Sequence, residues 1–153
     1  MKVRQANIGD AAEIAGFLEE LARLGKRNIP SDQDFVRTTY IDNADNICCL
    51  VAVDDNGEIL GVQVLKLATP GNDYGVTPGW GIIGTHVKAS AARRGVGRAL
   101  FTATRSAAAG AGLKKIDATI GAGNAEGLAY YEAVGFYTHE KVNGRVSKCF
   151  DVV

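Results

Sequence analysis

The sequence contains few cysteines and histidines, residues that commonly bind metal ions or form covalent intermediates. It has three cysteines and two histidines, without C-x-x-C or a similar ligand spacing. Cys48 and Cys49 would point to opposite faces of a strand, and Cys149 lies on a terminal one. This arrangement argues against a cysteine nucleophile with a histidine partner. We therefore expect reduced, buried thiols and no metal site.

Net charge and long apolar runs are also absent. Seventeen basic residues balance seventeen acidic ones, so no overall field attracts nucleic acid or an anionic membrane, and any anion binding must be local. Apolar runs such as 59–65 are far shorter than the ~20 residues that cross a bilayer, and residues 1–5 lead into no signal-peptide stretch. We expect a cytoplasmic protein with no membrane or nucleic-acid partner, and a single domain spanning residues 1–153.

Helical and strand patterns alternate along the chain. Apolar residues recur at helical spacing after Asp10, which can cap that helix, up to about Gly25. The β-branched-rich runs 47–53 and 59–67 flank Asp54–Glu58 and predict a hairpin. The remaining predicted elements are a strand at 2–6, a short helix after Ser31 and Asp32, a strand at 80–88, a helix at 94–111, a strand at 115–120, a helix at 124–134 and a hairpin of 136–142 with 146–152. This order predicts a domain of mixed α and β structure.

The segment Arg93-Arg94-Gly95-Val96-Gly97-Arg98 leads from a predicted strand into the predicted helix and forms its first turn. The first amides of a helix lack partners and point to one place, where the helix dipole is also positive, so this turn favours an anion. Its glycines would admit a pyrophosphate and its arginines would bind phosphate oxygens. The other interpretation is a tight turn with solvated arginines. A Walker loop is excluded because Arg98 follows Gly97, and the dinucleotide-like string at 79–84 lies inside a strand.

A second group of residues lies on the last predicted helix. Asn124, Leu128 and Tyr131 are spaced so that a capping amide, an apolar side chain and a phenol share one face, which can line a cleft. The alternative is structural: Asn124 is then a plain N-cap, and Tyr130 and Tyr131 are core aromatics. Taken alone, this motif leaves both interpretations open.

Together, the two motifs resemble those of the GCN5-related N-acetyltransferase (GNAT) superfamily. Residues 87–100 follow the family's run of a strand, then Gln or Arg-x-x-Gly-x-Gly or Ala, then a helix. Asn124, Tyr130-Tyr131 and Gly135-Phe136 match its second motif at the expected separation. The resemblance spans nearly the whole chain.

Three positions depart from the family pattern. Ala92 replaces the usual Gln or Arg, and Ala89 replaces a common proline. Gly127 stands where alanine is frequent, which weakens the helix but would leave room beside a cofactor. None of these changes removes the backbone amides that would hold a pyrophosphate.

The resemblance implies an α+β fold whose mostly antiparallel sheet splays open, and acetyl-CoA as the cosubstrate. The pantetheine arm would lie along the freed edge of strand 80–87 like an added strand. The residues that the resemblance assigns to binding coenzyme A are His86, Val87, Lys88, Arg93, Arg94, Gly95, Val96, Gly97, Arg98, Asn124, Gly127, Leu128 and Tyr131.

The resemblance also implies direct transfer of an acetyl group to a primary amine of a small molecule or peptide. An amide N–H near Val87 would polarise the carbonyl, and the Tyr131 phenol would protonate the leaving sulfur. The base stays open between His86, a carboxylate and water. The loss at Ala92 leaves open a coenzyme A sensor or interaction module without turnover. Transfer to a hydroxyl or hydrazine-like acceptor would share every motif and differ only in the acceptor pocket. Apolar residues of the last strand, such as Val146 and Phe150, favour edge pairing into a homodimer.

Overall fold

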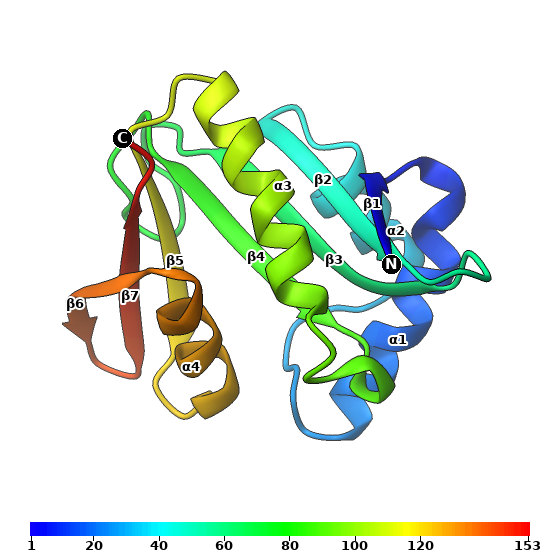
Figure 1. The fold of residues 1–153 in the computed structure, drawn as a ribbon. Coiled ribbons are helices and arrows are strands. Elements are labelled where there is room, and N and C mark those ends of the chain that lie inside the picture. The colour runs from blue at the N-terminus through cyan, green and yellow to red at the C-terminus, as the bar shows by residue number, and fades with distance from the viewer.

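A seven-stranded sheet forms the centre of the computed structural model, which describes all residues, 1–153 (Figure 1). The strand order is β1-β2-β3-β4-β5-β7-β6, and β4 with β5 is the one parallel pair. The strands are β1 (Lys2–Gln5), β2 (Asn46–Val53), β3 (Ile59–Leu67), β4 (Gly81–Val87), β5 (Lys115–Gly121), β6 (Tyr137–Val142) and β7 (Arg145–Asp151). The predicted mixed, mostly antiparallel sheet is confirmed.

Strands β4 and β5 are paired at one end only. Gly81 pairs with Ile116 and Ile82 pairs with Asp117, and no further pair follows. Figure 1 shows the two strands diverging beyond this point. The sheet is therefore splayed, as the resemblance implied.

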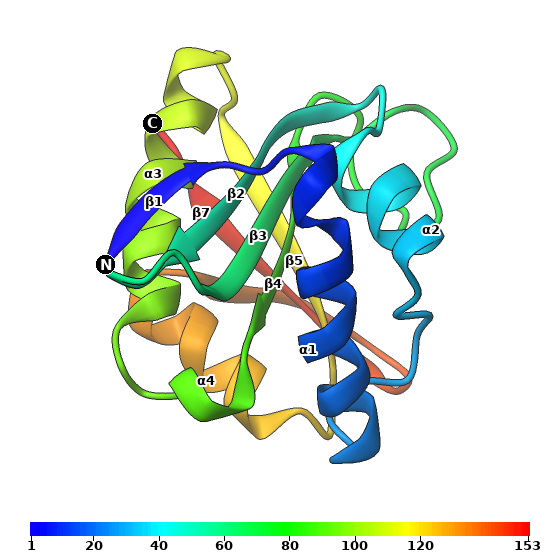
Figure 2. The same cartoon turned by 90° about the vertical axis from the view of Figure 1, so that its right-hand side faces the viewer.

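Helices cover the two faces of the sheet (Figure 2). The elements on one face are α1 (Ala11–Arg23), α2 (Gln33–Phe35) and the π-helical turn η2 (Val36–Ile41); those on the other are α3 (Val96–Gly110) and α4 (Ala125–Val134). Two short 3-10 turns are η1 (Ile8–Asp10) and η3 (Ala89–Ala91). No helix combines the length and the apolar composition that a membrane span requires.

The core is divided between the two faces because strand side chains alternate. On β2, Cys49 packs in the cluster under α1, whereas its neighbour Cys48 packs in the cluster under α3 and α4. All three cysteines are buried and free, as expected.

Two local predictions are wrong. Asp10 does not cap α1 with its side chain; its carboxylate accepts hydrogen bonds from the Arg4 guanidinium at 2.8 and 2.9 Å and from the Asn7 amide at 2.8 Å. The last strand, β7, is not a free edge, because it lies between β5 and β6 and buries Phe150 in the core. The outer strands are β1 and β6.

Candidate active site

Beyond its two pairs with β5, strand β4 has a free backbone edge. The Lys88 amide donates to the Leu60 carbonyl on β3 at 2.8 Å. Successive amides of a strand point to opposite edges, so Val87 and Thr85 direct their N–H and C=O groups to the unpaired side. Of His86, Val87 and Lys88, which were predicted to bind the cofactor, only Val87 offers its amide there.

The first turn of α3 has the geometry of an anion site. Gly95 is the N-cap residue with φ +81°, and Arg93 also has a left-handed φ of +61°. The Ala99 amide is the first to bond within the helix, to the Gly95 carbonyl, so the amides of residues 96–98 have no partner inside it. Arg93, Arg94 and Arg98 are exposed and belong to no salt bridge. Backbone and side chains thus both favour an anion at this turn.

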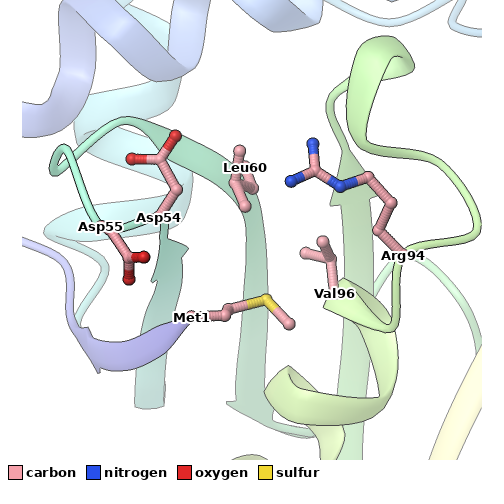
Figure 3. Close-up of a pocket in the computed structure, with 6 residues that line it drawn as sticks. All are labelled: Met1, Asp54, Asp55, Leu60, Arg94 and Val96. Carbon is pink, nitrogen blue, oxygen red and sulfur yellow. The ribbon is translucent and has the colours of Figure 1, made fainter.

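Two pockets flank this turn of α3. Figure 3 shows Arg94 extending toward Leu60 of β3, in a pocket also lined by Met1, Asp54, Asp55 and Val96. The other pocket lies between α3 and α4 and is lined by Arg98, Phe101, Thr102, Arg105, Ala133 and Val134. Arg94 and Arg98 therefore place positive charge on both sides of the helix start.

A side chain is disfavoured at each glycine of the two motifs for a different physical reason. Gly95 has a positive φ, and an added Cβ would meet nothing within 4 Å. Gly97 has no such φ, but its Cβ would lie 2.5 Å from the Tyr130 ring. A Cβ on Gly127 would lie 2.6 Å from the Asn124 side chain. Gly97 and Gly127 therefore make room for neighbouring side chains within the protein, a packing reason that the sequence did not indicate.

On α4 the motif residues have structural contacts as well. The Asn124 side chain accepts a hydrogen bond from the Gly127 amide at 3.0 Å and so caps the helix. Leu128 is partly buried against the core cluster. Tyr131 is 6% exposed, and its hydroxyl lies 2.9 Å from the Thr85 hydroxyl on β4. The phenol thus lies beside the free edge of β4.

A buried amide connects these hydroxyl groups. Gln63 on β3 is fully buried, and its Nε2 donates to the Thr85 hydroxyl at 2.9 Å and to the Tyr130 hydroxyl at 3.0 Å. Burial raises the pKa of Tyr131, and the Thr85 hydrogen bond opposes this only in part. Tyr131 is therefore a neutral phenol at physiological pH and is able to donate a proton.

His86 points to the opposite face of the sheet and is engaged there. Its Nε2 lies 3.3 Å from the Tyr40 hydroxyl, which accepts a hydrogen bond from Arg27 at 3.0 Å. Because Arg27 has only donors, the Tyr40 hydrogen is directed to Nε2, and the neutral ring carries its own proton on Nδ1. Burial, with Arg27 nearby, lowers the pKa of His86 to about 3. His86 is neutral, and its lone pair is occupied.

Comparison with known proteins identifies the family. The sequence pattern of the acetyltransferase (GNAT) family matches residues 15–136. The chain belongs to this family. No protein with a curated description matches the sequence significantly. The GNAT family uses acetyl-CoA as its cosubstrate.

Several solved GNAT structures share the fold at low sequence identity. A GCN5-related N-acetyltransferase from Kribbella flavida has a TM-score of 0.80 and 21% identity, over 98% of this chain and 96% of that one. YncA, a putative acetyltransferase from Salmonella typhimurium solved with acetyl-CoA, has a TM-score of 0.72 and 17% identity, over 99% and 94%. A spermidine N-acetyltransferase SpeG chimera from Vibrio cholerae has a TM-score of 0.73 and 16% identity, over 99% and 97%.

Acetyl-CoA fits the residues of this GNAT domain. The unpartnered amides and free arginines at α3 suit its pyrophosphate, and the unpaired groups of Thr85 and Val87 suit the pantetheine amides. The sequence did not indicate that Thr85 would hydrogen-bond Tyr131, or that Gln63 would hydrogen-bond Thr85. Both stand inside predicted strands, where a single polar residue gives no signal of its own.

The pair of Asp117 on β5 and His139 on β6 was also not predicted from the sequence. His139 Nε2 is 3.1 Å from the Asp117 carboxylate. The two residues are 22 positions apart, and no motif links them. The only signal was a carboxylate inside the strand predicted at 115–120.

Proposed function

We propose that this GNAT enzyme transfers an acetyl group from acetyl-CoA to a primary amine of a small molecule or peptide, by direct attack of the amine. The observation that carries the proposal is the buried, protonated Tyr131 phenol hydrogen-bonded to Thr85 at the free edge of β4. The likeness in fold to a spermidine N-acetyltransferase supports an amine as the acceptor class.

The binding step uses groups that the protein leaves without partners. The amides at the start of α3 and the adjacent Arg93 and Arg98 hold the pyrophosphate. The backbone of Thr85 and Val87 holds the pantetheine arm as an added strand. When bound, acetyl-CoA would supply the thioester carbonyl that the amine attacks, and a free-edge N–H of β4, that of Thr85 or Val87, would polarise it.

Proton transfer to the leaving sulfur comes from Tyr131. Its raised pKa keeps the proton on the phenol until a thiolate begins to form. The Thr85 hydroxyl then donates to the phenolate oxygen, while Gln63 donates to Thr85 and holds it in place. The surroundings of Tyr131 thus stabilise both its neutral phenol and its phenolate.

Acetyl-CoA binding measured by calorimetry at two salt concentrations tests the first half of the proposal. We expect micromolar or tighter affinity that weakens at high salt. Replacing Arg93, Arg94 and Arg98 together by Gln should weaken binding at least about tenfold, since each charge-assisted bond contributes ~1.5–3 kcal/mol. Arg23→Gln, on α1, is the matched control with unchanged affinity. Folded wild-type protein that does not bind acetyl-CoA contradicts the proposal.

Transfer to a panel of primary amines, including small amines and a lysine-containing peptide, tests the second half. Tyr131→Phe should lower kcat about 10²–10⁴-fold with little effect on acetyl-CoA affinity. If the wild type binds acetyl-CoA but acetylates no amine, the chain is not an N-acetyltransferase of this kind. If Tyr131→Phe keeps full kcat, Tyr131 is not the acid.

A further inference from the structure

The face of β4 opposite Tyr131 has an open position at Gly84, and Asp117 lies on the same face. Asp117 pairs with Ile82, and directly paired residues point to the same face of a sheet. Alternation places Gly84 on that face too, whereas Thr85 points to α4 and Tyr131. A base on the Asp117 face therefore works from the opposite side of the sheet to the acid.

The backbone conformation does not require a glycine at position 84, and this residue leaves open space on the face of Asp117. Its φ is not positive, and an added Cβ would meet only the His86 Nε2, at 3.9 Å. Gly84 is two residues along β4 from the row of Asp117, or about 7 Å at ~3.3 Å per residue. The space over Gly84 is next to the free edge of β4, and an acceptor amine can occupy it.

Asp117 and His139 form a hydrogen-bonded pair at the point where β4 and β5 separate. The Asp117 side chain is 3% exposed, and its other oxygen accepts a hydrogen bond from Thr119 at 2.8 Å. The ionised carboxylate has no donor, so His139 Nε2 carries the proton in this bond. The lone pair of the neutral ring is then on Nδ1, which has no partner in the protein. The His139 side chain is 29% exposed and stands beside the Trp80 ring, with centroids 5.9 Å apart.

The two histidines of the chain are thus arranged in opposite ways. His86 receives a hydrogen bond on its lone pair from Tyr40, whereas His139 donates through its N–H and keeps its lone pair free. A general base needs an available lone pair and a partner that fixes the ring. Only His139 meets both requirements.

We propose that Nδ1 of His139 removes the proton from the acceptor's ammonium group, directly or through one water, and that Asp117 positions the ring. This assignment rests on the proposed function. The nitrogen loses two protons overall. One passes through His139 to solvent before attack; the second leaves as the amide forms and restores the Tyr131 proton given to the sulfur. The C–S bond breaks as the C–N bond forms, and the products are the acetamide, coenzyme A thiol and one released proton.

The charge of Lys115, whose Nζ lies 6.0 Å from the centre of the Trp80 ring, is already balanced. Lys115 on β5 pairs with Asp151 on β7 and also hydrogen-bonds the Tyr137 hydroxyl on β6. Trp80 contributes no charge. Asp117 is therefore the group that governs the His139 ring, and the imidazolium formed after proton transfer is stabilised by its carboxylate.

The test is kcat/KM against pH for His139→Ala and Asp117→Asn, with the best amine of the panel. Lys141→Gln, an exposed position on the same strand, is the control with wild-type behaviour. At pH 7 we expect His139→Ala to lose about 10²–10⁴-fold in kcat/KM. The loss should shrink at high pH, where the amine loses its proton unaided, and added imidazole should partly restore the rate. Asp117→Asn should also slow the reaction, because an amide can donate to Nε2 and reverse the tautomer.

Thermal unfolding and acetyl-CoA affinity of each variant show whether it is folded. Imidazole ¹⁵N NMR of the wild type gives a readout without turnover: we expect the proton on Nε2 in His139 and on Nδ1 in His86. Transfer by His139→Ala at the wild-type rate and pH profile, or a protonated Nδ1 in neutral His139, overturns the assignment and leaves the proposed function intact. Binding of acetyl-CoA without transfer to any amine overturns the proposed function, and the base assignment with it.

Discussion

The hydroxyl of Tyr130 on α4 donates a 2.8 Å hydrogen bond to the carbonyl oxygen of Gly97 in the first turn of α3. Its ring lies 2.5 Å from the place where a Cβ on Gly97 would stand. This contact joins the two motifs of the sequence, because it connects the anion-binding turn to the helix that holds Tyr131. The second glycine of the turn is therefore required by packing.

The variants Gly97→Ala and Gly95→Ala should destabilise the protein for different reasons. Gly97→Ala forces its Cβ against the Tyr130 ring, and we expect a loss of about 1–3 kcal/mol in the free energy of unfolding. Gly95→Ala adds only the cost of a left-handed backbone, about 1–2 kcal/mol. Urea unfolding measures both. Tyr130→Leu should relieve the first variant and not the second; additive effects for Tyr130→Leu with Gly97→Ala would refute the contact.

Thr85→Val should slow transfer while leaving acetyl-CoA binding nearly unchanged. Valine keeps the shape and the backbone of the strand but removes the hydroxyl that donates to the Tyr131 phenolate. A hydrogen bond to a charged group contributes ~1.5–3 kcal/mol, so we expect kcat to fall about tenfold or more. Single-turnover kinetics with calorimetry separates the two effects. An unchanged kcat would show that Thr85 does not assist Tyr131.

Stability should fall in acid because of Asp10. The Arg4 guanidinium, with the Asn7 amide, lowers the pKa of the Asp10 carboxyl below its ordinary value of ~3.9. A carboxyl with a lowered folded-state pKa stabilises the fold above its unfolded pKa and loses this effect as pH falls through the folded one. We expect the midpoint of urea unfolding to drop from about pH 4 downward, and less steeply in Arg4→Gln. Equal acid dependence in both proteins would exclude this source.

Removing the partner of Lys148, on β7, should lower the free energy of unfolding more than replacing Lys148 itself. It is 1% exposed, and its Nζ donates to Glu132 on α4 at 2.9 Å and to Thr138 at 2.8 Å. Glu132→Ala leaves a buried ammonium group with one neutral acceptor, and we expect a loss of about 1–3 kcal/mol. Lys148→Met removes the charge and keeps the volume, so it should cost less. The reverse order in thermal unfolding would contradict this prediction.

The sequence alone predicted the local elements and the two motifs with good accuracy. Nearly every strand and helix was found because each depends on residues close together in the chain: the apolar period, the hairpin turn after Val53 and the cap at Asn124. The anion-binding turn was also local, since strand, glycines and arginines follow one another from Val87 to Arg98. Asp10 was the local exception, because Arg4 competes for the carboxylate that would otherwise cap α1.

Only the tertiary structure decided which groups face one another. The register of β3 with β4 turns the Val87 amide, and not those of His86 or Lys88, to the free edge. Tyr40 occupies the lone pair of His86, while Asp117 leaves that of His139 open. These contacts join segments from 22 to 46 residues apart, so their geometry depends on strand register and helix packing. The periodicity of a single segment carries no information about either, and this is why the pattern indicated an acetyltransferase but left its general base open between His86, a carboxylate and water.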